Sequence, residues 1–214
     1  MPSRTLSEVR TSIRTEINRG TGGLSDARID EAVRNVIHSH RSRRYGFNVK
    51  RAGLTVGSEY VTLPDDFLEI DALRLDASSY VKPLIEVGVE FIHQEKRSPS
   101  YESEPVYFAV DQNGSTRELR FYPQPDQTFS CQITYLYDLA ESSSWTDDLT
   151  LEWFDEAYLL VKYGAMAEIE ATHIGDPEAQ QKAMVWAGLA AKAENELRRQ
   201  GRLQQHSGSI EPCI

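Results

Sequence analysis

Apolar residues recur every three or four positions near both ends of the chain, whereas the middle of the chain follows another pattern. At the N-terminal end two such stripes predict two helices, one ending near Arg19 and one beginning near Asp26, with the Gly-rich segment 20–23 between them. Ser25 is a suitable N-cap for the second helix, and the basic run 41–44 suits its end, where cations favour the helix dipole. The two stripes consist of Leu6, Val9, Ile13, Ile17, Ile29, Val33, Val36 and Ile37.

Residues 47–148 carry short β-rich segments that Gly, Pro, Asn and Asp separate, which is typical of strands and turns. Asn113-Gly114 is a strong hairpin signal, because both residue types tolerate the positive φ that tight hairpin turns need. The sequence therefore predicts a β-rich domain of about a hundred residues. Its predicted strands are residues 60–63, 70–75, 106–110, 118–122 and 130–137.

The 3.6-residue period returns after residue 148 and predicts a third helix. Gly175 is expected to follow its last turn, and Asp176 is expected to cap a fourth helix. This fourth helix is predicted to end near Gln200, with Gly201 as its stop. The apolar face of the third helix is formed by Leu151, Phe154, Tyr158, Val161 and Ala165.

These elements predict an α+β fold in which an antiparallel bundle of four helices is split by a β-rich domain between helices two and three. Short connections make each helix pair antiparallel, and small residues permit close helix crossing. We expect the bundle to depend on the packing of Gly164, Ala165, Tyr158 and Trp186. The predicted domains are a first helical hairpin (1–46), the β-rich insertion (47–148), a second helical hairpin (149–200) and an extended C-terminal tail (201–214).

Charge is distributed unevenly along the chain. The formal net charge is -10, but residues 1–51 carry 11 Lys and Arg against 5 Asp and Glu, which is +6 and leaves -16 for the remainder. A basic segment on an acidic body is compatible with nucleic-acid binding or with packing between neighbouring copies. We favour packing between copies, because a strongly acidic body repels a phosphate backbone.

The sequence contains no motif for catalysis, a cofactor or a metal, and we predict a protein that is not an enzyme. The glycines of segment 20–23 lack the following Lys-Ser/Thr of a phosphate loop. His38 and His40 stand two apart, whereas the metalloprotease motif needs a spacing of four. The acid pairs 65–66 and 147–148 precede turns and helix starts, which explains them without glycosidase chemistry.

No apolar stretch reaches the eighteen residues that a membrane span requires, and the N-terminus lacks the apolar region of a signal peptide. With only Cys131 and Cys213, the chain has no disulfide framework and no paired-cysteine metal site. We therefore expect a protein made in the cytosol that functions there, or in a particle assembled there, without a membrane partner.

Four segments occur in an order that resembles a known family. They are Val61-Thr-Leu-Pro-Asp-Asp-Phe-Leu-Glu-Ile70, residues 119–126, residues 131–137 and, above all, residues 155–168. In this order they resemble the head-to-tail adaptor proteins of tailed bacteriophages, the connector group that includes the tubular adaptors of short-tailed phages. The resemblance spans about residues 55–200, and its specificity lies in the order of the segments together with the split bundle.

The resemblance implies a structural subunit of a ring, usually of twelve copies, beneath the portal of the filled phage head. Such a ring extends the channel for genomic DNA, which passes without sequence-specific binding, and offers a platform for the tail or nozzle protein. The resemblance also implies that the C-terminal segment reaches the portal. Candidate portal-docking residues in it are Leu203, Ile210 and Ile214.

Other functions remain open at this point. Within the phage neck, a stopper or tail-completion protein is the first alternative. A DNA-binding protein could use the basic N-terminal helices, with the arginines of run 41–44 on phosphates. A tail-associated hydrolase could use a carboxylate pair of the β-rich domain.

Overall fold

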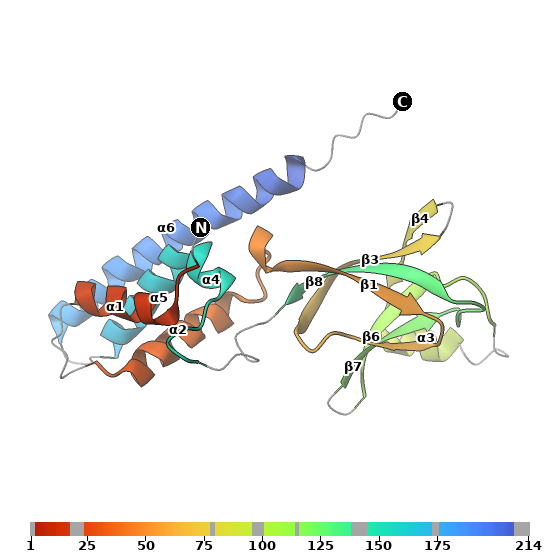
Figure 1. Cartoon of the computed structure of the whole chain (residues 1–214), viewed down its shortest axis with the longest axis horizontal. Coiled ribbons are helices and arrows are strands. Elements are labelled where there is room, and N and C mark those ends of the chain that lie inside the picture. The colour runs from red at the N-terminus through yellow and green to blue at the C-terminus, as the bar shows by residue number, and fades with distance from the viewer. Residues whose placement is uncertain are drawn as a thin grey trace. The chain divides into compact units, whose positions relative to one another are not determined.

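A computed structural model describes residues 3–17, 24–77, 80–95, 101–113, 116–137, 145–172 and 176–207 of the 214-residue chain, with side chains described as far as Gly201 (Figure 1). The chain forms two compact units. Residues 1–48 and 138–214 make one unit, here called the helical unit, and residues 49–137 make the other, here called the strand unit. The predicted α+β class is confirmed, since helices and two sheets are both present.

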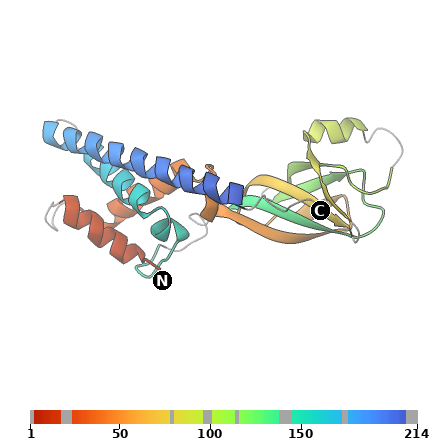
Figure 2. The same cartoon turned by 90° about the horizontal axis from the view of Figure 1, so that it is seen from above.

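Helix α5 lies at the centre of the helical unit, where it contacts α1, α2, α4 and α6. The long helix α6 runs beside α5 in both views (Figures 1 and 2). Residues 46–48 form a short 3-10 helix, η1, after α2. The helices of this unit are α1 (Leu6–Ile17), α2 (Asp26–His40), α4 (Glu152–Asp155), α5 (Tyr158–Ala171) and α6 (Pro177–Ser207).

Local capping explains where several helices begin. At α1, the Glu8 backbone N–H donates to Thr5 Oγ1 while the Thr5 backbone N–H donates to Glu8 Oε2, which is a capping box. At α2, the Arg28 N–H donates to Ser25 Oγ, as the predicted N-cap requires. Asp176 Oδ1 accepts from the first free N–H groups of α6. The predicted starts of α2 and α6 are therefore confirmed.

Residues from both ends of the chain share one hydrophobic core. The predicted stripes of α1 and α2 are buried, and they meet the buried side of α5. Leu24 also joins this core, where it precedes the N-cap of α2. The remaining contributions from the C-terminal half include Leu151, Trp153, Phe154, Ala157, Leu160, Val161, Ala165, Met166, Ile169 and Ala190.

The prediction of one continuous third helix is wrong. The chain forms the one-turn helix α4, leaves helical geometry at Ala157 (φ -111°, ψ 22°) and then begins α5. This break accompanies the burial of Trp153 beside Phe154, and the Trp153 ring packs edge-on against Tyr45 at 5.8 Å and Phe47 at 5.1 Å between ring centroids. Aromatic pairs of this geometry contribute about 0.5–1.5 kcal/mol each beyond their buried area.

The predicted end of the last helix is also wrong. Helix α6 continues through Gly201 to Ser207, so the predicted extended tail is helical over its first half. A glycine inside a helix costs only about 1 kcal/mol relative to alanine, and the residues that follow it include the good helix formers Arg, Leu and Gln. Gly201 therefore interrupts the helix too weakly to stop it.

The strand unit contains two four-stranded sheets, with orders β1-β8-β3-β4 and β2-β7-β6-β5. Helix α3 (Val89–Glu95) contacts β6 and β7. The buried side chains of β8 alternate at Phe129, Cys131, Ile133 and Tyr135, which marks one covered face of its sheet. The strands are β1 (Val49–Val56), β2 (Tyr60–Thr62), β3 (Phe67–Ala77), β4 (Tyr80–Pro83), β5 (Ile85–Glu86), β6 (Tyr107–Asn113), β7 (Thr116–Tyr122) and β8 (Phe129–Tyr137).

Each predicted strand overlaps an observed one, and the predicted hairpin is confirmed, since β6 and β7 pair antiparallel with Asn113 opposite Thr116. Residues 114–115 between them lie outside the described residues. The sequence did not predict β1, β4, β5 or α3 within the β-rich region. Strand β1 carries Lys50, Arg51 and Gly53, which obscure its period, and it is held by pairing along its whole length with β8.

Gly164 and Gly188 offer a matched test of helix packing. A Cβ at Gly164 of α5 would lie 2.9 Å from Val36 Cγ2 of α2, whereas one at Gly188 of α6 would meet nothing within 4 Å. We expect Gly188→Ala to stabilise the chain by about 0.5–1 kcal/mol through helix propensity. We expect Gly164→Ala to destabilise it, because overpacking of about 1–3 kcal/mol exceeds that gain. Urea unfolding measures both, and equal stabilisation by the two changes would refute the close α2–α5 contact.

Candidate functional site

The four residues predicted to pack the bundle all lie on α5 or α6. Gly164 faces Val36, and Ala165 is fully buried beside it. The Tyr158 hydroxyl donates to Ser12 Oγ of α1 over 2.7 Å, and Trp186 stacks on Tyr163 with ring centroids 5.7 Å apart. Tyr158 therefore joins α5 to α1, and Trp186 joins α6 to α5.

Of the three residues proposed to dock to the portal, the structure places one. Leu203 lies within the last turns of α6, on a helix where an extended segment was predicted. Ile210 and Ile214 lie outside the described residues.

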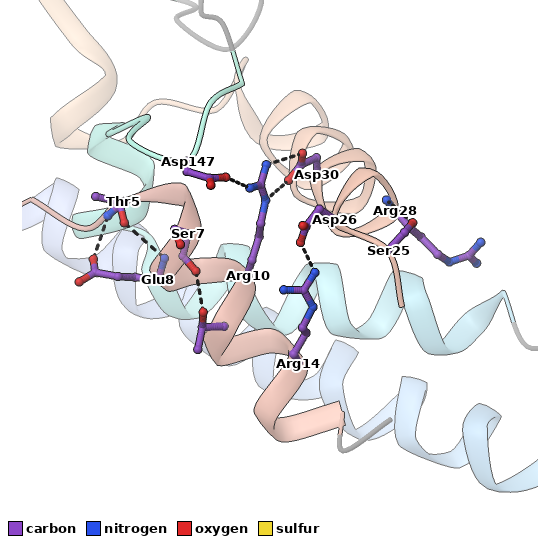
Figure 3. A network of polar contacts seen from close by, with 11 residues as sticks. Thr5, Ser7, Glu8, Arg10, Arg14, Ser25, Asp26, Arg28, Asp30 and Asp147 are labelled. Atoms are coloured by element: carbon purple, nitrogen blue, oxygen red, sulfur yellow. Dashed lines mark hydrogen bonds and ion pairs between the residues drawn. The ribbon is translucent and has the colours of Figure 1, made fainter. Parts of the chain in front are cut away.

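A buried ion pair joins α1 to α2 (Figure 3). Arg10 Nε donates to Asp30 Oδ1 and Arg10 Nη2 donates to Asp30 Oδ2, each over 2.7 Å, while Arg10 Nη1 donates to Asp147. Only 9% of the Arg10 side chain and 13% of the Asp30 side chain are exposed. The hydrogen bonds from Arg10 to Asp30 raise the pKa of Arg10 above its ordinary value, so the guanidinium stays charged.

A second pair lies one turn away on both helices, where Arg14 of α1 donates to Asp26 of α2. This pair is more open to solvent, with 32% of the Arg14 side chain and 55% of the Asp26 side chain exposed. The two pairs thus have the same chemistry in different surroundings. Sequence reasoning missed Arg10, although a detectable signal existed, because Arg10 shares the apolar face of α1 with Leu6 and Ile13.

Several charged side chains of residues 1–48 form ion pairs within the helical unit. Residues 1–48 contain 9 Lys and Arg against 5 Asp and Glu, while residues 138–214 contain 6 against 14. Arg10 reaches Asp147 and Arg43 reaches Glu194, so basic groups of the first segment meet acidic groups of the second. In the opposite sense, Lys162 of α5 donates to Glu16 of α1.

Glu194 of α6 is the centre of a cluster at the end of α2. It accepts from Arg43 and, over 2.6 Å, from Arg198, and its carboxylate lies 3.8 Å from His40 Nε2. Burial alone would raise the pKa of Glu194, but the hydrogen bonds and charges of Arg43 and Arg198 outweigh burial and lower it. Arg43 of the basic run after α2 is thus engaged by α6, which disfavours a DNA-binding role for this arginine.

The strand unit has a buried polar cluster of its own. Arg120, 5% exposed, donates to Glu59 Oε1 over 2.9 Å and also donates to His93 Nε2 of α3. This cluster therefore ties β7 to α3 and to the segment before β2. Burial raises the pKa of Cys131 to about 11, so its thiol stays protonated and unreactive at neutral pH.

The acid pairs considered for hydrolytic chemistry have structural partners. Asp66 accepts from Lys50 Nζ over 2.6 Å and from the Tyr135 hydroxyl over 3.1 Å, and Asp147 accepts from Arg10. Across the described ranges, no group of three or more His, Cys, Asp and Glu residues is placed to hold a metal ion. In the same ranges, no helix combines the length and apolarity that crossing a membrane requires.

The helical unit is thus held together by helix packing and ion pairs, and the strand unit has a buried ion pair of its own. Comparison with protein families indicates the role of the whole chain. The model of the family described as SU10 adaptor protein matches residues 4–212. The chain belongs to the SU10 adaptor protein family. No curated protein matches it.

Membership in the SU10 adaptor family agrees with the predicted resemblance to phage head-to-tail adaptors. It indicates a structural phage adaptor, a component of the virion that interacts with other virion proteins such as portal and tail. The family is not known as one of enzymes, in keeping with the structural roles of the charged groups described above.

Arg10 and Arg14 provide a matched test of the polar network. Arg10→Met leaves Asp30 buried without its cation, which we expect to destabilise the chain by about 3–5 kcal/mol. Arg14→Met removes a solvent-exposed ion pair, and we expect it to lower the free energy of unfolding by about 1 kcal/mol or less. Chemical denaturation reports both values. Similar losses for the two variants would contradict the buried character of the Arg10–Asp30 pair, and a near-neutral double variant Arg10→Met/Asp30→Leu would support it.

Glu194 should make stability depend on pH in the acid range. Because its pKa is lower in the folded chain, its contribution is present above the unfolded pKa and is lost as pH falls through the folded pKa. We expect Glu194→Gln to destabilise the chain by about 1–2 kcal/mol at pH 7 and by much less at pH 3. Urea unfolding at the two pH values tests this, with the exposed Glu196→Gln as control. A pH-independent loss would remove the ion-pair explanation.

Proposed function

We propose that this adaptor forms a ring of twelve copies beneath the portal of the filled head. The ring extends the DNA channel and gives the tail or nozzle protein its attachment platform. The observation that carries this proposal is the family match over residues 4–212, nearly the whole chain. We further propose that the subunits assemble onto the head in the host cytoplasm.

The helical unit is suited to a load-carrying part of such a ring. Its core draws on both ends of the chain, and its buried Arg10–Asp30 pair joins α1 to α2. The strand unit, with its own buried residues, can then present a separate surface. We propose that the helical unit forms the ring wall and that the strand unit provides contacts to the tail.

DNA is proposed to pass through the ring without sequence-specific binding. The net charge of -10 opposes lasting attachment of a polyphosphate, because affinity for DNA grows with the number of basic groups that neutralise phosphates. The engagement of Arg43 by Glu194 removes one such group from the basic run. Both features favour a channel through which DNA slides.

Electron microscopy of the protein with and without the portal of the same phage tests the ring. We expect twelve-fold rings coaxial with the portal, either in the free protein or only after portal addition. A portal that captures no adaptor, together with a free protein that forms no ring, would overturn the proposed function. A ring of another copy number would correct the stoichiometry alone.

The segment 201–214 is proposed to dock to the portal. Changing Leu203, Ile210 and Ile214 together to Asp should weaken portal capture at least tenfold, because burying a carboxylate in an apolar contact is strongly unfavourable. Pull-down on immobilised portal measures the loss, and urea unfolding verifies the fold. The matched control changes Ser207 and Ser209 to Asp in the same segment. Equal capture by the wild type and the triple variant would locate the docking surface elsewhere.

A further inference from the structure

Helix α6 carries two large apolar side chains on its outward face. Met184 is 72% exposed and Val185 is 55% exposed, near the N-terminal end of the helix. Lys182 and Lys192 are also exposed. Lys182 lies three residues before Val185 and Lys192 lies seven residues after it, so both are on the same side of the helix as Val185. Lys182 shares its charge with Glu178, which lies 2.7 Å away. The charged residues around this apolar protrusion are therefore Glu178, Lys182 and Lys192, which give its border one net positive charge.

The same helix forms one wall of a groove near its other end. The groove has a volume of about 440 Å³ and lies between the start of α5 and the C-terminal part of α6. Its apolar lining includes Leu160, Ala193, Leu197 and Leu159, which is 50% exposed although it belongs to the central helix. An exposed leucine beside an open groove is the feature that a partner side chain would cover.

The border of the groove is acidic. Among the described side chains, Asp155, Glu156 and Glu196 line it together with one basic residue, Arg4. The Arg4 backbone N–H donates to Asp155 Oδ1 over 2.8 Å, so part of this charge is already engaged, while Glu156 and Glu196 are exposed. The apolar groove with its acidic border therefore complements the apolar protrusion with its basic border.

A single molecule cannot fill its own groove with its own protrusion. Val185 and Leu197 are twelve residues apart on one continuous helix, a separation of roughly 18 Å along the axis at 1.5 Å per residue. The protrusion can therefore enter such a groove only on another molecule. A closed ring with more than two copies needs two different surfaces on each subunit, because every copy contacts its neighbours head to tail.

We propose that Met184 and Val185 of one copy enter the Leu159–Leu197 groove of the neighbouring copy. This inference rests on the proposed ring and names the subunit contact within it. Lys192 then approaches Glu156 and Glu196 of the neighbour. Every subunit supplies one protrusion and one groove, so the contact repeats around the ring until it closes.

Engineered cysteines test the contact in a Cys213→Ser background, which leaves only the buried Cys131 thiol. The double variant Leu159→Cys/Val185→Cys, treated with a short bifunctional thiol reagent on assembled rings, should give a ladder of covalent multimers. Either single variant should stay monomeric, because each contact then lacks one thiol. The control Ala27→Cys/Val185→Cys uses an exposed alanine of α2 and should also give no ladder.

The size of the products separates the possible outcomes. A ladder supports the head-to-tail contact, whereas products that stop at dimers show a two-fold contact between copies and overturn the ring geometry proposed here. Absence of any product from rings that are visible by microscopy overturns this contact and leaves the proposed function intact. Absence of rings in the wild type, with portal present, is the separate failure of the proposed function.

Mixing of two blocked variants gives an independent readout. Met184→Asp blocks the protrusion and Leu159→Asp blocks the groove, and each alone should lose ring formation while keeping its unfolding midpoint. Combined in equal amounts, they should form a one-to-one dimer, because a single productive contact remains between them. Ala27→Asp is the control and should still form rings. A mixture that stays monomeric by analytical ultracentrifugation would contradict the proposal.

Discussion

Helix α5 must be covered on almost all of its sides, and this requirement organises the helical unit. Of the residues of α5, only Leu159 and Ala171 are exposed. The hairpin of α1 and α2 comes from one end of the chain and α6 from the other, and both pack on α5. The approach of α2 is close enough that Gly164 has no room for a side chain beside Val36. The chain therefore has to return to its starting unit after the strand unit is made.

Charge pairing follows the same division. The basic excess of residues 1–48 and the acidic excess of residues 138–214 meet inside one unit, most clearly where Arg10 reaches Asp147 and Arg43 reaches Glu194. A buried pair such as Arg10–Asp30 contributes little to net stability, but it favours one packing arrangement of the two helices. If either helix shifted, both charges would stay buried without a partner. In the proposed ring each subunit would match identical neighbours, which requires a single defined arrangement.

The candidate surfaces were accessible to sequence reasoning only in part. Gly164, Tyr158 and Trp186 were predicted as packing residues because helical periodicity places them, and in the structure they lie against α2, α1 and α5, respectively. The groove near Leu197 was not predicted, because a leucine at an apolar helical position does not by itself indicate an open groove. Its lining includes Glu156 and Ala157 at the break between α4 and α5, and this break was not predicted either.

By itself the sequence determined that both ends of the chain are helical and that its middle is rich in strands. It also determined the N-caps Ser25 and Asp176 and the hairpin of β6 and β7. All of these features depend on residues that are close together in the chain. The tertiary structure alone decided the pairing of Arg10 with Asp30 and Asp147, the pairing of Glu194 with Arg43 and the pairing of β1 with β8. These pairings join residues from twenty to more than a hundred positions apart. Local propensity carries no information about such contacts, and at Gly201 it was too weak to end a helix.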